Sequence, residues 1–128
     1  MLNWLDSLPI NLLSKDLEGL WTRQQAISDN IANVSTPGYK SKVVSFEDQL
    51  KGLLADPSNQ EDVNQQIKDV EPSVTVTDDL TSRLDGNNVD VEQQNVESVR
   101  TQFNYMYSLR ELSSYFSRLK YVITEGKS

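Results

Sequence analysis

Hydrophobic residues recur every three or four positions over the first third of the chain. This is a heptad pattern, with two apolar positions in seven, and it is typical of a helix packed along one partner. Pro9 suits the first turn of a helix, and Pro37 ends it because proline disfavours helical conformation at the preceding residue. The pattern therefore predicts a helix over roughly residues 10–34. Its apolar positions are Ile10, Leu13, Leu17, Leu20, Ile27, Ile31 and Val34, with Gln24 filling the one gap.

A second apolar stripe runs through the last third of the chain. Between Phe103 and Leu112 three successive spacings of three residues occur, which departs from a strict heptad repeat. Asp90 followed by Gln93 is a capping-box pattern, so we expect this helix to begin at residue 90. The stripe consists of Val96, Val99, Phe103, Met106, Leu109, Leu112, Phe116, Leu119 and Ile123.

The middle of the chain, residues 35–89, has no sustained hydrophobic period. Polar residues and proline dominate residues 56–73. Residues 43–54 could form a short helix and residues 74–77 a brief strand, whereas residues 85–88 have the composition of a turn. We therefore expect a variable, irregular or partly disordered linker that orders on binding.

These patterns predict a mainly α fold that forms one structural unit. Its parts are an N-terminal helix in residues 1–34, a turn motif and linker in residues 35–89, and a C-terminal helix in residues 90–128. The two end helices are expected to pair as a coiled coil. A lone pair would leave rings such as Tyr107 and Phe116 partly exposed, so we expect neighbouring subunits to cover both helices. A self-contained helical hairpin is the alternative from periodicity alone.

Composition narrows the possible chemistry. The net charge of −7 argues against a protein that binds nucleic acid through its phosphates. The chain has no Cys and no His, which excludes thiolate metal sites, cysteine nucleophiles and Ser–His relays. Asp78, Asp79, Asp85 and Asp90 lack the spacing of a calcium loop, and the other carboxylates are mostly isolated. We expect no enzyme activity, no cofactor, no metal and no small-molecule substrate.

The N-terminal sequence lacks a basic segment followed by an apolar run, so we expect no secretory signal peptide. No stretch approaches the ~20 apolar residues of a membrane-spanning helix.

Two short motifs carry a resemblance to a known family. The first resembles the N-terminal signature of bacterial flagellar axial proteins, which include rod, hook and hook-associated subunits. Its residues are Asn30, Ala32, Asn33, Thr36, Pro37, Gly38 and Tyr39, with Phe46 and Glu47 downstream. The second is similar to a motif of the proximal rod subunits, and comprises Asp85, Gly86, Asn87, Asn88 and Asp90. From chemistry alone, Asn30 and Asn33 could cap the last carbonyls of the helix or fix how the chain leaves it.

The resemblance implies a structural subunit of the basal-body rod that polymerises through its terminal helices, transmits torque and helps to form the export channel. The implied partners are other rod subunits, further copies of the chain, the export gate and the membrane-ring base of the flagellum. Export would use the flagellar type III apparatus without a cleaved signal peptide. The expected assembly interface takes most of the two apolar stripes: Leu13, Leu17, Leu20, Ile27, Ile31, Val34, Val96, Val99, Phe103, Leu109, Leu112, Phe116, Leu119 and Ile123. The alternative is a coiled-coil adaptor that forms a closed complex with one partner helix.

Overall fold

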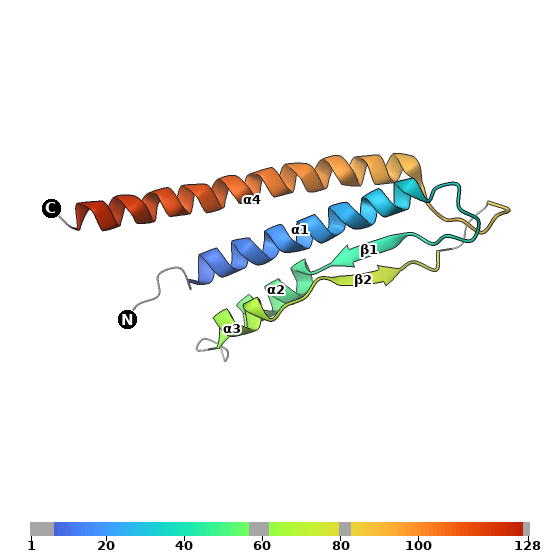
Figure 1. The fold of residues 1–128 in the computed structure, drawn as a ribbon. Helices are drawn as coiled ribbons and strands as arrows, with labels where there is room; N and C mark the ends of the chain where they lie inside the picture. Colours follow the sequence, from blue (N-terminus) through green and yellow to red (C-terminus); the bar gives the residue numbers. More distant parts are fainter. Residues whose placement is uncertain (1–6, 57–61, 80–82, 127–128) are drawn as a thin grey trace.

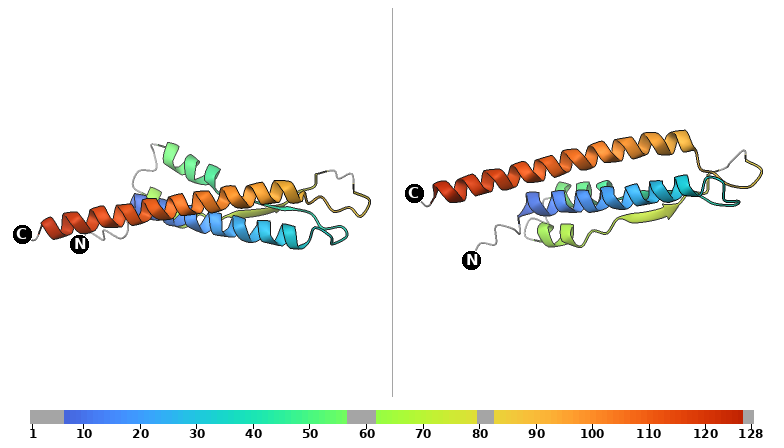
Figure 2. Two further views of the ribbon diagram at one scale, coloured as in Figure 1. Left: turned by 90° about the horizontal axis from the view of Figure 1, so that it is seen from above. Right: turned by 45° about the horizontal axis from the view of Figure 1, so that its top comes forward.

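The computed structural model describes residues 7–56, 62–79 and 83–126. The two long helices lie side by side and antiparallel, and the short elements lie on the other side of α1, which is therefore the central layer (Figure 1). The longer helix, α4, extends past the first residue of α1 in every view (Figure 2). In chain order the elements are α1 (Leu8–Ala32), β1 (Lys42–Ser45), α2 (Glu47–Ala55), α3 (Val63–Lys68), β2 (Ser73–Val76) and α4 (Val91–Glu125).

Both predicted end helices are present, and the mainly α fold is confirmed. Pro9 lies in the first turn of α1, where its missing N–H breaks no helical hydrogen bond. The helix ends two residues earlier than expected, so Val34 lies just beyond it. Asp90 caps α4 as predicted, because its Oδ1 accepts a hydrogen bond of 3.2 Å from the backbone N–H of Gln93.

The described part of the middle segment is more ordered than the sequence predicts. β1 and β2 form an antiparallel pair in which Lys42 lies opposite Val76 and Ser45 opposite Ser73. The expected strand near residues 74–77 is thus confirmed. The helix expected from residue 43 begins only at Glu47, because Val43 and Val44 pair with β2. Helix α3 forms within the polar stretch of residues 56–73, of which residues 57–61 lie outside the described part.

The core lies between α1 and these short elements. Phe46 packs against Gly19, where a β-carbon would overlap the phenylalanine ring. Arg23 joins the same two layers, since it donates to both carboxylate oxygens of Glu47, at 2.6 and 2.8 Å, and to the carbonyl of Val44 at 2.9 Å. The buried cluster contains Leu20, Ala26, Val44, Phe46, Leu50, Ile67 and Val70. In the described residues no helix is long and apolar enough to cross a membrane.

The close contact at Gly19 makes a prediction with a built-in control. Gly19→Ala adds a good helix former but forces its methyl group into the Phe46 ring, so we expect a net loss of about 1–3 kcal/mol in unfolding free energy. Gly52→Ala in α2 meets no atom within 4 Å and should stabilise the chain by about 0.5–1 kcal/mol. Urea unfolding followed by circular dichroism measures both. Equal effects of the two substitutions would contradict the packing described.

Candidate assembly interface

The apolar stripe of α1 faces α4. Gln24, which fills the gap in the stripe, donates a hydrogen bond of 2.9 Å to the hydroxyl of Ser98 in α4. Leu20 and Ile27 are buried, with exposed fractions of 2% and 5%. The remaining predicted positions of this stripe, Leu13, Leu17, Ile31 and Val34, are half-buried. The position of the stripe is thus settled by the contact with α4, while its role in assembly stays a prediction.

The side of α4 that faces α1 is polar along its first half. Gln94, Thr101 and Ser108 recur at seven-residue intervals and are buried. Three hydrogen-bonded pairs, which we call the polar ladder, join the helices: Asn30 with Gln94 at 2.9 Å, Gln24 with Ser98 at 2.9 Å, and Asp16 with Ser108. The two predicted apolar stripes therefore do not face each other over this half of α4.

The apolar stripe of α4 points away from α1 instead. Phe103 is 68% exposed, and its neighbours along the stripe are also exposed. The sequence predicts the stripe, but it does not predict that α1 packs against the opposite side of α4. We define the outer face of α4 as Val96, Val99, Phe103 and Met106, with Leu109 at its edge.

The three successive spacings of three residues explain where this face ends. A step of three residues advances roughly 300° around a helix, so each such step turns the stripe back by about 60°. Three steps from Phe103 to Leu112 thus rotate the stripe by about half a turn, onto the side that faces α1. Leu112 and Leu119 are half-buried there. Phe116 and Ile123 remain exposed; the neighbouring Tyr115 hydroxyl lies 3.5 Å from the Ser7 hydroxyl, so Phe116 is level with the start of α1 and the rest of α4 continues past it.

Asn30 is the centre of the first motif. Its side chain is fully buried and makes four hydrogen bonds. Its amide N–H groups donate to the Lys42 carbonyl and to Gln94 Oε1, both at 2.9 Å. Its oxygen accepts from the Lys42 N–H at 2.9 Å and from the Tyr39 hydroxyl at 3.1 Å. Asn30 therefore pairs with β1 as a neighbouring strand would, and ties α1 to the turn and to α4.

Asn33 has the capping role that the sequence allowed. Its amide donates to the Asp29 carbonyl at 2.8 Å, in the last turn of α1. Its oxygen accepts a hydrogen bond of 3.1 Å from the Thr36 hydroxyl, which extends the cap into the turn. Ala32, another residue of the motif, is exposed.

Asn87 closes the end of α1 from the second motif. It is fully buried, and its amide donates to the carbonyls of Asn33 and Thr36 at 2.8 and 2.9 Å. Its oxygen accepts from the Val89 N–H at 2.8 Å. Asn88 similarly accepts from the Ser41 N–H at 2.6 Å. Two asparagines that were predicted only as turn residues therefore hold the motifs together.

The two turns also touch directly. Gly38 and Gly86 have positive φ angles of 74° and 77°, which favour glycine. Tyr39 N–H donates to the Thr36 carbonyl, as expected for a type II turn with Pro37 and Gly38 at its centre. Gly38 N–H donates to the Asp85 carbonyl at 2.7 Å. We call these two joined motifs the elbow.

Sequence reasoning missed the residues that complete these contacts. Gln94 bonds Asn30, and Lys40 Nζ donates to the Gly86 carbonyl at 2.6 Å. Asp16 was not singled out, although burial raises its pKa while the hydrogen bond from Ser108 lowers it. The only signal in the sequence was the seven-residue spacing of Gln94, Thr101 and Ser108, which periodicity of apolar residues alone does not detect.

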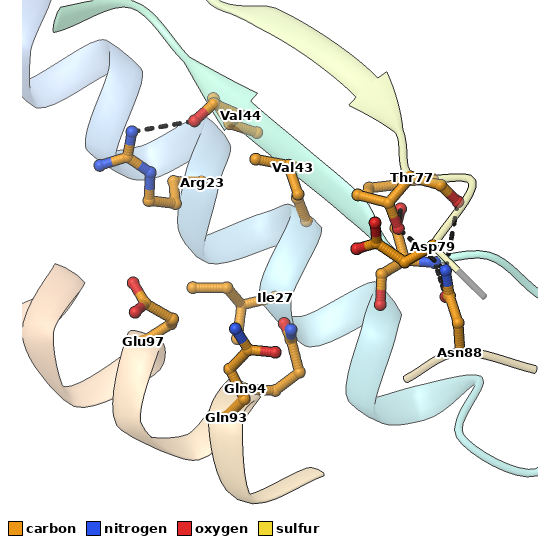
Figure 3. A pocket seen from close by; sticks show the side chains of 13 residues that line it. Arg23, Ile27, Val43, Val44, Thr77, Asp79, Asn88, Gln93, Gln94 and Glu97 are labelled. Carbon is orange, nitrogen blue, oxygen red and sulfur yellow. Dashed lines mark hydrogen bonds between the residues drawn. The ribbon is translucent and has the colours of Figure 1, made fainter. Parts of the chain in front are cut away.

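A cleft of about 220 Å³ lies between α1, β1 and the start of α4 (Figure 3). Arg23, on its wall, is engaged with Val44 and Glu47, and the Arg23 hydrogen bond holds the pKa of Glu47 below its usual range. The carboxylates of Asp79 and Glu97 lie on different sides of the cleft in Figure 3. In the residues that the structure describes, no group of three acidic side chains could hold a metal ion.

Because every hydrogen-bonding group of the Asn30 side chain has a partner, substituting it should lower the free energy of unfolding in a pH-dependent way. Asn30→Asp keeps the acceptor but directs a buried carboxylate at the Lys42 carbonyl, so we expect a loss of about 3 kcal/mol at pH 7. Burial raises the pKa of the introduced carboxyl in the folded chain above its unfolded value of about 3.9. The folded state then binds more protons, and the defect shrinks as pH falls towards 4.

Urea unfolding at pH 7 and pH 4.5 measures this effect relative to the unsubstituted chain. Asn33→Asp is the matched control, because Asn33 is half-buried and loses one hydrogen bond, at a cost of about 1 kcal/mol. A defect of Asn30→Asp that is small, or that grows at low pH, would refute the described hydrogen-bond network.

Comparison with known proteins agrees with this geometry. Residues 20–40, which include the first half of the elbow, match the family model described as flagella basal body rod protein. The flagellar basal body rod protein FlgB of Bacillus subtilis is 35% identical over 109 residues, covering 82% of this chain and 84% of that protein. FlgB of Borreliella burgdorferi is 31% identical over 84% of this chain and 89% of its own length. FlgB of Escherichia coli is 27% identical over 81% of this chain and 84% of its own.

These relatives confirm the resemblance seen in the two motifs and narrow it to proximal rod subunits of the B type. They do not favour the alternative of a coiled-coil adaptor. Their names describe a structural component of the rod. Since the identity reaches 35% over most of both sequences, the chain belongs to the flagellar basal body rod protein family.

Proposed function

We propose that this chain is a non-catalytic subunit of the basal-body rod that polymerises through the outer face of α4. One observation carries the proposal: four large apolar side chains on one side of α4, and Leu109 at the edge of that side, are exposed. Contiguous apolar patches on soluble monomers commonly mark interaction sites. A neighbouring subunit that covered this face would remove all five side chains from water.

Burying the outer face would contribute several kcal/mol to a contact between subunits. Fully burying a large apolar side chain contributes about 1.5–3 kcal/mol, so five half-exposed ones contribute roughly 5 kcal/mol together. Phe116, level with the start of α1, and Ile123, about two turns further along α4, are also exposed and would add to the contact. The predicted interface residues that are already buried, such as Leu20, act indirectly by supporting α4.

The placement of this face suits a growing polymer. α4 lies on one side of α1 and the short elements lie on the opposite side (Figure 1), and the exposed outer face is the side of α4 turned away from α1. If one copy places its outer face on a different surface of its neighbour, the contact is heterologous and need not close. Such contacts build helical or tubular assemblies, which supports self-association and association with other rod subunits.

The family resemblance also supports expectations about the location, partners and export of the subunit. In the basal body the subunit would cross the periplasm as part of the rod, help to transmit torque and form part of the export channel. Its partners would include the export gate and the membrane-ring base. It would be exported by the flagellar type III apparatus without a cleaved signal peptide.

Substitution on the outer face tests the proposal. Phe103→Asp and Leu109→Asp place a charge in the proposed interface, and we expect either to abolish rod assembly and motility in a strain that lacks the native chain. The stability of the isolated chain should change by less than about 1 kcal/mol, because both side chains are exposed. Motility in soft agar, electron microscopy of basal bodies and urea unfolding give the three measurements.

Asn104→Asp is the control, since it adds the same charge at an exposed position of α4 beside the outer face. It should leave assembly intact. Normal rods in both outer-face variants, at normal protein level, would rule out this face as the interface. Leu20→Asp is a poorer test, because Leu20 is buried and its replacement would unfold the chain.

A further inference from the structure

The orientation of α4 about its own axis is unexpected from hydrophobicity alone. Turned by half a turn, α4 would place Val99, Phe103 and Met106 against the apolar stripe of α1. Burial of apolar surface would favour that arrangement. In the structure, Gln94, Thr101 and Ser108 occupy these positions instead, and the outer face remains in water. Some other interaction must therefore select the observed orientation.

The polar ladder supplies that interaction. Its three pairs lie along one antiparallel register: α1 residues 30, 24 and 16 meet α4 residues 94, 98 and 108 in order. A shift of one heptad would bring Thr101 opposite Asn30 and Tyr115 opposite Asp16. The shift would break the observed hydrogen bonds, and the shorter Thr101 and the larger Tyr115 side chains would have to replace Gln94 and Ser108 as partners of buried polar groups.

Asp16 has its hydrogen-bond partner on α4 only in the observed orientation. In the structure its carboxylate is half-buried and accepts a hydrogen bond from Ser108. Two charged residues act on it electrostatically, Glu47 on α2 and Arg23 on α1. Turning α4 by half a turn would withdraw the Ser108 hydroxyl and bring the side of α4 that carries Met106 and Arg110 toward this carboxylate. Buried polar groups of this kind lower stability but can specify register and orientation.

We propose that the polar ladder orients α4, so that its outer face stays turned away from α1 and available to a neighbouring subunit. The residues of the ladder are positioning residues for the interface, and this inference rests on the proposed function. Without the ladder, α4 turns and the chain buries its own assembly face against α1.

Single cysteines can report the orientation, because the chain has no native Cys. Phe103→Cys places a thiol on the outer face, and Asn104→Cys places one at a flanking exposed position. Each is combined with three backgrounds of the full-length chain: the native ladder; an apolar ladder in which two pairs are replaced, with Asp16→Leu, Gln24→Leu, Ser98→Leu and Ser108→Leu; and a hydroxyl-retaining ladder with Ser98→Thr and Ser108→Thr. Maleimide labelling rates and circular dichroism are measured on the same samples.

In the native and hydroxyl-retaining backgrounds the two thiols should react at rates within about threefold of each other. In the apolar ladder the thiol at position 103 should react at least about tenfold more slowly than that at 104, because burial protects it. The same background should show a higher thermal midpoint, since apolar pairs replace polar ones. A folded apolar-ladder chain whose thiol at 103 stays as reactive as that at 104 would overturn the proposal.

If the fourfold variant fails to fold, the double variant Asp16→Leu with Ser108→Leu removes one pair only. The labelling rate at position 103 relative to that at 104 is then measured in this variant. A drop of about threefold or more supports the inference, and an unchanged ratio in this folded variant refutes it. Motility separates this inference from the proposed function. Intact rods in Phe103→Asp would reject the outer face as an interface, yet leave the labelling result valid as a statement about orientation.

Discussion

The structure depends on the contact between α1 and α4, which is polar on the α4 side where a coiled coil is usually apolar. On the α1 side of this contact the buried residues include apolar Leu20 and Ile27, whereas on the α4 side they are polar: Gln94, Thr101 and Ser108. Hydrogen bonds across this contact fix the register but bury little apolar surface. The apolar residues of α4 are left outside as a result. The exposed apolar surface of the chain is therefore the one that the proposed contact between molecules would use.

The elbow also holds α1 and α4 together, at the end of α1 and the start of α4. Asn30 uses every donor and acceptor of its amide, and Asn87 satisfies two carbonyls at the end of α1. Buried amides in such networks are sensitive to small displacements, because each lost bond leaves a group that water cannot reach. The turn, the start of β1 and the start of α4 therefore behave as one rigid unit. This unit sets where α4 begins and in which direction it runs.

The sequence predicted the two end helices, the helix stop at Pro37, the Asp90 cap and the strand near residues 74–77. Each has a local signal in composition or spacing. It did not predict the order of the middle segment, because Phe46 and Ile67 are isolated apolar residues whose burial depends on the distant Gly19 face of α1. Nor did it predict the side on which α1 covers α4. That choice depends on hydrogen bonds between residues as far apart as Asp16 and Ser108, which no local pattern encodes.

The central position of α1 limits how neighbouring subunits can bind. One side of α1 is covered by α4, and the other by β1 and α3. Contacts between molecules must therefore use mainly the outer face of α4, its extension past α1, or the surface of the short elements. The outer face is the apolar one, whereas residues 35–90 carry most of the net negative charge. Like-charged surfaces repel each other, so pairing of two copies through their acidic residues 35–90 is disfavoured. A contact between the outer face of one copy and a different surface of the next is favoured instead. Polarity of growth then follows from the unequal surfaces of a single chain.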